Sequence, residues 1–359
     1  RCVAGEDAFG VGNIIPKGYP LRKDLDVLKD FEAQYRIRRS ADGILTGRPI
    51  VQPPQVQAFN APPDGAVLHL IDPRDSKRHP EAMMLNRLME AYLFEKRARN
   101  AERAAKLTSA FFDLCDHLLD QGFAEGNRNS SSWCFPHRMV FAMREELAAT
   151  GRLRDLLLAS IACATSYGDG ILAVEDWRTH DILGGPRNTD GFRNYPELLG
   201  LAVLLPDPAE RLQRLCAFRR AVSLLCDPQL GEPYAWDGTM HHHPLFHLAY
   251  AYGALVPVAF HLRDTSFRFT PDATALLKRS VMAVGFMANA RGIVPPNCPG
   301  YTGQPLGIYN RDAQAALLLA HCNTAESRNG VDADLAGICV AFHADNPNPP
   351  APIQRFRAM

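Results

Sequence analysis

The stretch Glu81–Gly122 reads EAMMLNRLMEAYLFEKRARNAERAAKLTSAFFDLCDHLLDQG, and it decides the fold class of the chain. Its apolar residues recur at spacings of three and four, which is the period of an amphipathic helix. The stretch ends at Gly122, and glycine commonly terminates a helix because it adopts the left-handed conformation without strain. The same periodicity predicts further helices over Arg138–Thr150, Leu153–Thr165, Tyr195–Leu205, Ala209–Cys226, Leu245–Leu262, Pro271–Ala290 and Arg311–Cys322.

The rest of the chain predicts no sheet, because no window of six residues alternates convincingly between apolar and polar positions. We therefore expect an all-α protein with about eight to ten helices. Helices joined by short connections pack as antiparallel hairpins, so many of them in one domain predict a helical toroid or a solenoid. No fixed-period repeat is visible, which makes a regular array the less favoured arrangement.

Three segments follow from these patterns. Residues 1–80 are predicted to be a loop-rich N-terminal segment packed on the toroid, with helical pieces near Leu21–Arg38 and after Pro80. Residues 81–345 carry the helical pattern and are expected to form the toroid itself. Residues 346–359 begin with a stretch rich in Pro and Asn and are expected to be a linker or tail.

The composition is that of an ordinary globular protein. Hydrophobic residues make up 47% and charged residues 22% of the 359 residues, which excludes a disordered or fibrous chain. Lys+Arg and Asp+Glu both number 39, and a net charge of zero argues against a general nucleic-acid binder. No apolar run reaches the length of about 18 residues that a membrane span needs. The nine cysteines form no CxxC motif, so we expect most of them in helix cores.

Residues Trp236–Gly253 read WDGTMHHHPLFHLAYAYG, and they gather four histidines and two tyrosines between a predicted turn and a predicted helix. His243 and Tyr250 are seven residues apart, so a helix through both would place them on one side. Tyr252 would lie about 200° further round the helix than Tyr250. Only one of the two tyrosines can therefore face a cleft that His243 also faces.

This segment has three possible interpretations. The first is a solvated, histidine-rich helix entrance with tyrosines in the core. The second is a metal site, since His243 and His247 have the spacing that zinc-binding helices use, although no third ligand is obvious. The third is proton transfer by a His/Tyr pair, in which the histidine polarises a phenol whose pKa is ordinarily near 10.

The segment, with two others, resembles the catalytic domain of the chondroitin ABC lyases, which belong with the chondroitin AC and hyaluronate lyases. The resemblance covers roughly residues 15–300, and the motifs keep the order and spacing found in that family. The similar motifs are Asp237-Gly238-Thr239 with His243, Tyr250 and Leu262–Phe267; Ala110–Phe123 with Ser132-Trp133 and Arg138; and Gly185–Asp190.

The resemblance implies an (α/α) toroid, here incomplete, that cleaves acidic glycosaminoglycans by β-elimination. It implies that Asn188 and His243 neutralise the uronate carboxylate, which stabilises the enolate-like transition state. A tyrosine removes the C5 proton and protonates the leaving oxygen. Tyr250 has the spacing of the ABC lyases and Tyr252 that of the AC and hyaluronate lyases. We favour Tyr250.

The resemblance also implies a set of substrate-binding residues and no cofactor. A tryptophan stacks on a sugar ring, and arginine meets a carboxylate or sulfate. No metal is required, no nucleic acid or membrane is expected as a partner, and secretion or a periplasmic location in a bacterium is implied. The proposed substrate-binding residues are Trp133, Arg138, Asn194, His242 and Arg291.

Two departures from the family bear on activity. The loop Gly292–Gly300 contains no arginine where the family has a catalytic one, although Arg291 and Arg311 flank it. The chain also ends before the β-sheet domain that supplies a glutamate in the family, so we expect that domain to be missing here. A second hypothesis is therefore a catalytically degenerate toroid that binds acidic glycans. A third is a glycoside hydrolase with Asp190 and Asp237 as its carboxylate pair.

Overall fold

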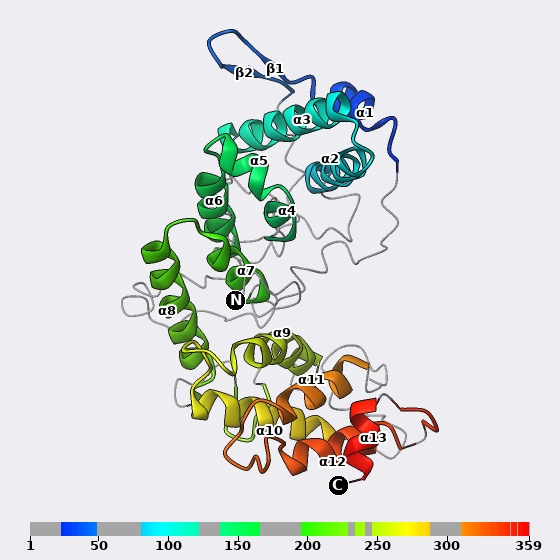
Figure 1. Cartoon of the computed structure of the whole chain (residues 1–359). Coiled ribbons are helices and arrows are strands. Elements are labelled where there is room, and N and C mark those ends of the chain that lie inside the picture. Colours follow the sequence, from blue (N-terminus) through cyan, green and yellow to red (C-terminus); the bar gives the residue numbers. More distant parts are fainter. Residues whose placement is uncertain are drawn as a thin grey trace. The chain divides into compact units, whose positions relative to one another are not determined.

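The computed structural model describes residues 23–48, 80–121, 137–165, 195–228, 234–240, 246–287, 310–344, 346–349 and 351–358. Within these ranges it contains thirteen helices and one hairpin of two short strands (Figure 1). The predicted all-α fold class is confirmed. The chain divides into two compact units, which are described separately. Unit 1 comprises Arg1–Gly170 and Glu197–Arg211, and unit 2 comprises Ile171–Pro196 and Leu212–Met359.

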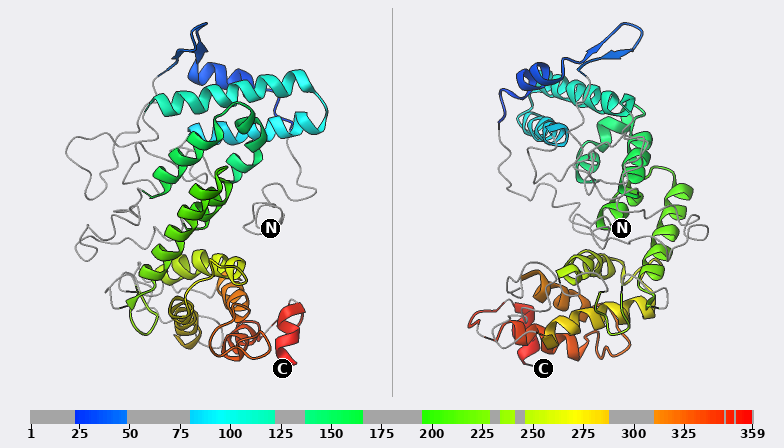
Figure 2. Two further views of the ribbon diagram at one scale, coloured as in Figure 1. Left: turned by 60° about the vertical axis from the view of Figure 1, so that its left-hand side comes forward. Right: turned by 180° about the vertical axis from the view of Figure 1, so that it is seen from behind.

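Unit 1 is built on a pair of long helices. Helix α2 (Pro80–Arg97) packs along α3 (Ala101–Asp120), and both views of Figure 2 show them side by side. The unbroken helical pattern predicted over Glu81–Gly122 is therefore two helices. The break is at Arg99, whose φ of 58° is left-handed, and at Asn100, whose side chain accepts a hydrogen bond from the backbone of Arg103. Local capping chemistry ends one helix and starts the next without interrupting the apolar spacing.

Unit 1 contains further elements besides this pair. Sequence periodicity predicted one helix over Arg138–Thr150, but the structure has two, with Met143 between them, whereas the predicted helix over Leu153–Thr165 is confirmed. Helices α7 and α8 each begin in one unit and continue into the other. The remaining elements are α1 (Val27–Tyr35), β1 (Arg38–Arg39), β2 (Leu45–Thr46), α4 (His137–Ala142), α5 (Arg144–Ala149), α6 (Leu153–Thr165), α7 (Tyr195–Leu204) and α8 (Pro208–Leu225).

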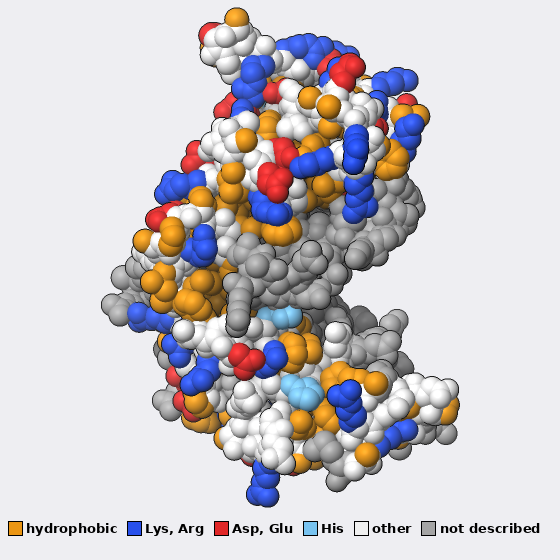
Figure 3. Space-filling view, in the orientation of Figure 1, with side chains coloured by type: hydrophobic (Ala, Val, Ile, Leu, Met, Phe, Trp, Pro, Cys, Tyr) orange, Lys and Arg blue, Asp and Glu red, His pale blue; other side chains and the backbone are white. Residues whose placement is uncertain are grey.

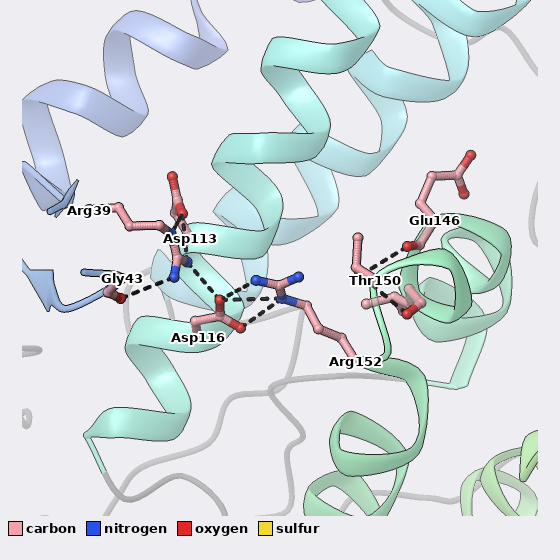
Figure 4. A network of polar contacts seen from close by, with 8 residues as sticks. Arg39, Gly43, Asp113, Asp116, Glu146, Thr150 and Arg152 are labelled. Carbon is pink, nitrogen blue, oxygen red and sulfur yellow. Dashed lines mark hydrogen bonds and ion pairs between the residues drawn. The ribbon is translucent and has the colours of Figure 1, made fainter. Parts of the chain in front are cut away.

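Charged side chains attach the hairpin and the α5–α6 connection of unit 1 to α3. Arg39 on β1 contacts Asp113 at 2.8 Å and Asp116 at 2.7 Å. Arg152 contacts the same Asp116 at 2.9 Å, so one carboxylate lies between two guanidinium groups (Figure 4). All four side chains remain partly exposed. Acidic and basic side chains are also interspersed over the described surface of unit 1 in Figure 3, in keeping with the zero net charge.

Unit 2 packs five helices, α9 to α13, against one another. Helix α9 (Phe246–Leu262) contacts α10 (Pro271–Met287) and α11 (Asn310–Ala320), and α12 (Ala333–Phe342) packs on α11 and α10. The three longest of these were predicted from the sequence, to within about two residues where the ends are described. Helix α12 was not predicted.

Helix α13 (Ala351–Arg357) lies in the segment that the sequence predicted to be a linker or tail. It packs against α12 and buries Ile353 and Phe356, which are 1% and 8% exposed. The described helices thus outnumber the eight to ten expected. The two helices that the sequence did not predict, α12 and α13, have 10 and 7 residues. Helices this short are stabilised mainly by packing on their neighbours.

An ion-pair cluster with a buried centre at Lys278 and Asp332 fixes the start of α12. Lys278 on α10 contacts Asp332 at 2.9 Å, Asp334 at 2.8 Å and Glu326 at 3.2 Å. The Asp332 side chain is 0% exposed, caps α12 by accepting from the backbone of Leu335, and accepts a hydrogen bond from the Thr324 hydroxyl. One lysine therefore links α10 to the segment between α11 and α12.

The described residues also test two expectations from composition. Four of the five described cysteines are buried and one, Cys216, is exposed, as expected for cysteines used as small apolar residues. No described helix combines the length and apolar character needed to cross a membrane. The closure of the helices into a toroid, and the segment boundaries at residues 80 and 345, stay predictions.

Candidate active site

A short hairpin over residues 234–240 precedes α9, the helix that carries the two candidate tyrosines. The ends of the hairpin, Tyr234 and Met240, form an antiparallel bridge. The backbone N–H of Ala235 donates to the Thr239 carbonyl at 2.8 Å, and the N–H of Gly238 donates to the Ala235 carbonyl at 3.0 Å. The turn predicted at Asp237-Gly238 is therefore present, and it belongs to a hydrogen-bonded hairpin.

Asp237 stabilises this turn with its own side chain. Its Oδ1 accepts a hydrogen bond from the Thr239 backbone at 2.9 Å and another from the Thr239 hydroxyl at 2.6 Å. An aspartate that bonds to the backbone two residues later is a common turn former. This structural role accounts for Asp237 without a catalytic one, which weakens the hypothesis of an Asp190/Asp237 hydrolase pair. Asp190 lies outside the described residues.

Gly238 brings the hairpin directly against α10. Its φ of 87° is left-handed, which strains residues other than glycine. A Cβ atom at this position would lie 2.5 Å from the Arg279 carbonyl carbon and from the Ser280 backbone nitrogen. The Asp-Gly-Thr motif thus contacts α10 through its central residue, Gly238, and only glycine fits at this position.

The base of the hairpin is buried in a cluster of polar side chains. Tyr234 and Ser280 are both 0% exposed. Burial raises the pKa of Tyr234 well above its ordinary value and nearby Cys226 adds to the rise, while a hydrogen bond with Ser280 opposes it. Burial likewise raises the pKa of the Cys226 thiol to about 12. The Tyr234 phenol and the Cys226 thiol therefore stay neutral at physiological pH.

The described part of α9 begins at Phe246, three residues after His243. The helical period therefore places Tyr250 and Tyr252 about 200° apart around α9. It gives no angular position for His243, which precedes the described part of the helix. The side chain of Tyr252 is 1% exposed. The side chain of Tyr250 and the whole of His243 lie outside the described residues, so the pairing of His243 with a tyrosine stays a prediction.

Most of the predicted site lies outside the described residues. Helix α4 includes Arg138 and α9 includes His247, but their side chains are not described. Among the residues that the structure does describe, no group of three or more His, Cys, Asp or Glu side chains could hold a metal ion. The predicted residues outside the description are Asn188, Asn194, Trp133, His242, His243 and Arg291.

Comparison with known families supplies the decisive observation. A family model described as "Lyase, catalytic" matches residues 14–346, which is nearly the whole chain. The chain belongs to this lyase family. It is a polysaccharide lyase, and its substrate is a polysaccharide. The predicted family resemblance is confirmed at this level, and a search of curated proteins finds no match that would narrow it further.

The hairpin before α9 carries two aromatic residues that sequence reasoning did not assign. Tyr234 anchors the hairpin, and Trp236 stands on it with 63% of its surface exposed. The turn signal at Asp237-Gly238 located the hairpin, but nothing in the local sequence distinguishes the buried Tyr234 from the exposed Trp236. Tyr234 is a bridge residue and Trp236 lies in the turn two residues later, so packing against the rest of unit 2, including α10, decides which aromatic residue is covered.

Proposed function

We propose that this lyase cleaves uronate-containing glycosaminoglycans (chondroitin sulfate, dermatan sulfate or hyaluronan) by β-elimination. The C5 proton of a uronate is only weakly acidic while its carboxylate keeps a full negative charge. Donors on that carboxylate stabilise the enolate-like transition state. Asn188 and His243 are proposed as those donors. The lyase family supports elimination as the reaction class, and the resemblance of the site motifs supports the uronate substrate.

Tyr250 is the proposed acid and base in this mechanism. The burial of Tyr252 is the observation that carries the assignment, because a base must reach the C5 proton of a sugar in a polymer and Tyr252 is 1% exposed. Tyr250 lies on a different side of α9 by the helical period. Its phenol would take the C5 proton and return a proton to the leaving O4 oxygen. His243 is proposed to lower the pKa of that phenol by placing positive charge near it.

Substrate binding is proposed for five further residues, and export to the periplasm or the exterior of a bacterium is proposed on the same resemblance. An aromatic side chain stacks on the apolar face of a sugar, arginines pair with sulfate or carboxylate groups, and amide or imidazole groups bond to hydroxyls. The five residues are Trp133, Arg138, Asn194, His242 and Arg291.

Replacing Tyr250 with Phe tests the mechanism. Tyr250→Phe is expected to lower kcat by about 10³-fold, because general acid–base catalysis contributes about 10²–10⁴. Binding of the glycan should stay close to that of wild type. The measurement is the ultraviolet absorbance of unsaturated products from chondroitin sulfate, dermatan sulfate and hyaluronan. Hydrolysis gives no such absorbance, so the assay also separates elimination from hydrolysis.

Tyr252→Phe is the matched control, since it removes the same hydroxyl two residues away. It is expected to keep kcat within about threefold and to lower stability by about 1 kcal/mol through the loss of a buried polar contact. Full activity in Tyr250→Phe together with inactivity in Tyr252→Phe would transfer the catalytic role to Tyr252.

A glycan-binding protein without activity is the second candidate function. The observation that favours it is the loop Gly292–Gly300, which has no arginine to stabilise a tyrosinate. Binding of acidic glycans with no unsaturated product, in wild type as in Tyr250→Phe, would establish this candidate instead.

A further inference from the structure

We propose that Trp236 is a sugar-stacking residue, which binds one ring of the polymer on the surface of unit 2 before α9. This inference rests on the proposed function, because it assumes that an acidic polysaccharide occupies this part of the protein. It assigns a substrate contact to a residue of the hairpin, in addition to those that the family resemblance implies.

The exposure of Trp236 is unusual for its position. Its side chain is 63% exposed, whereas Tyr234 and Met240 at the two ends of the same hairpin are 0% and 1% exposed. Tryptophan is a large, mostly apolar side chain that is normally well buried. Leaving its indole in water forgoes the free energy of burying it, so a ligand that covers the indole gains that free energy.

The hairpin holds Trp236 in a fixed place. Asp237 bonds twice to Thr239, the hairpin closes through its own backbone, and Gly238 lies against the backbone of α10 at Arg279 and Ser280. A rigid loop loses little conformational entropy when a ligand binds. An exposed aromatic residue on such a loop is preorganised for binding.

Two observations indicate a sugar of an acidic polymer as the ligand. The first is the place in the chain, since Trp236 lies seven residues before His243 and ten residues before Phe246, where the described part of the helix of the candidate tyrosines begins. The second is Arg279, an exposed residue of α10 whose backbone meets the hairpin at Gly238. An indole covers the apolar C–H face of a pyranose, and a guanidinium pairs with a carboxylate or sulfate on the same or the next sugar.

Other exposed apolar residues do not share these features. Among the described residues, Leu25, Ile44, Leu212 and Phe286 are also more than half exposed. Leu25, Ile44 and Leu212 lack a flat aromatic surface. Phe286 is 77% exposed near the end of α10, seven residues after Arg279, and it lies on a helix rather than on a hairpin. It therefore provides a matched control for the removal of an exposed aromatic side chain.

Substitution of Trp236 tests the inference by its effect on KM and kcat. Trp236→Ala is expected to raise KM for chondroitin sulfate by about tenfold with kcat within about twofold, because stacking away from the reacting bond binds ground state and transition state alike. Trp236→Phe, which keeps an aromatic face, should raise KM by about threefold or less. Phe286→Ala should match wild type. An unchanged KM in Trp236→Ala, or an equal rise in Phe286→Ala, would overturn the inference.

Direct binding separates this inference from the proposed function. The affinity for uncleaved chondroitin sulfate is measured by calorimetry in the Tyr250→Phe background, with and without Trp236→Ala. A loss of about tenfold in affinity supports the inference even if wild type forms no unsaturated product, in which case only the proposed activity fails. Normal turnover by wild type with no loss of affinity in Trp236→Ala overturns the inference and leaves the proposed function standing.

Discussion

Units 1 and 2 both use charged side chains to attach a loop to a helix, but they differ in how far these charges are buried. In unit 1, Arg39 and Arg152 share the carboxylate of Asp116, and their side chains are 35% and 31% exposed. In unit 2, Lys278 is 11% exposed and its partner Asp332 is 0% exposed. Water reaches every member of the first group, whereas in the second the Lys278–Asp332 pair is buried and only its outer carboxylates, Glu326 and Asp334, are exposed.

The depth of burial determines how much each group of charges contributes to stability. A partly exposed ion pair contributes little because water solvates its members when it breaks, whereas a buried charge that loses its partner is left without compensation. In unit 2, consecutive residues of α10 carry both attachments: Lys278 holds the start of α12, and Arg279 and Ser280 meet the hairpin at Gly238. The placement of the hairpin and the stability of unit 2 therefore depend on the same turn of α10.

The largest difference in stability between the two groups is expected when a cation is removed from each. Lys278→Met is expected to destabilise unit 2 by about 3–5 kcal/mol, because Asp332 would remain buried without a counter-charge. Arg39→Met should cost unit 1 only about 0.5–1 kcal/mol, since Arg152 still neutralises Asp116. Hydrogen exchange followed by mass spectrometry measures each unit separately, through peptides of α12 and of α3. Equal losses in the two variants would contradict the distinction drawn from burial.

The next largest effect is expected from a single methyl group on the hairpin. Gly238→Ala combines the strain of a left-handed alanine with a collision against the backbone of α10, and we expect a loss of about 3 kcal/mol together with reduced activity. Gly43→Ala is the matched control, because Gly43 has a φ of 86° and nothing lies within 4 Å of its Cβ position. It should cost about 1–2 kcal/mol, the strain alone. Thermal unfolding measures the loss of stability and the product assay measures the loss of activity. Equal effects of the two substitutions would mean that the contact of Gly238 with α10 does not contribute to stability.

The smallest of these effects is expected from acid. Burial by itself would raise the pKa of Asp332, but the hydrogen bond from Thr324 and the ion pair with Lys278 outweigh burial and hold the pKa below its ordinary value. The folded state therefore gains stability from ionised Asp332 above the unfolded pKa of about 3.9, and loses it as the pH falls through the lower folded pKa. Urea unfolding of unit 2 should give a free energy that declines between about pH 5 and pH 2, with a shallower decline in Lys278→Met. A wild-type stability that rises toward acid would contradict this assignment.

The helical pattern predicted most of the fold and missed its interruptions. Periodicity placed the ends of α6 correctly because the apolar face of that helix is continuous from Leu153 to Thr165. It ran through the breaks at Arg99 and Met143, since a cap or a turn changes the backbone without changing the apolar spacing. It also missed α13, which is seven residues long and depends on α12 for its burial.

The sequence predicted which residues belong to the candidate site, but not how their side chains are arranged in space. The turn at Asp237-Gly238 was correct because both residues favour turns for local reasons. The choice between Tyr250 and Tyr252 could not be made from spacing, since both spacings occur among the lyases that the chain resembles. The burial of Tyr252 favours Tyr250, and burial depends on which helices pack against α9.

The all-α class, the positions of most long helices and the lyase family follow from the amino-acid sequence alone, because periodicity, turn chemistry and short motifs are local along the chain. Packing in three dimensions is what brings Gly238 against α10, covers Tyr234 while leaving Trp236 exposed, and buries Asp332 beside Lys278. These facts depend on contacts between residues far apart in sequence, and the free energy of burial belongs to such contacts rather than to any one segment.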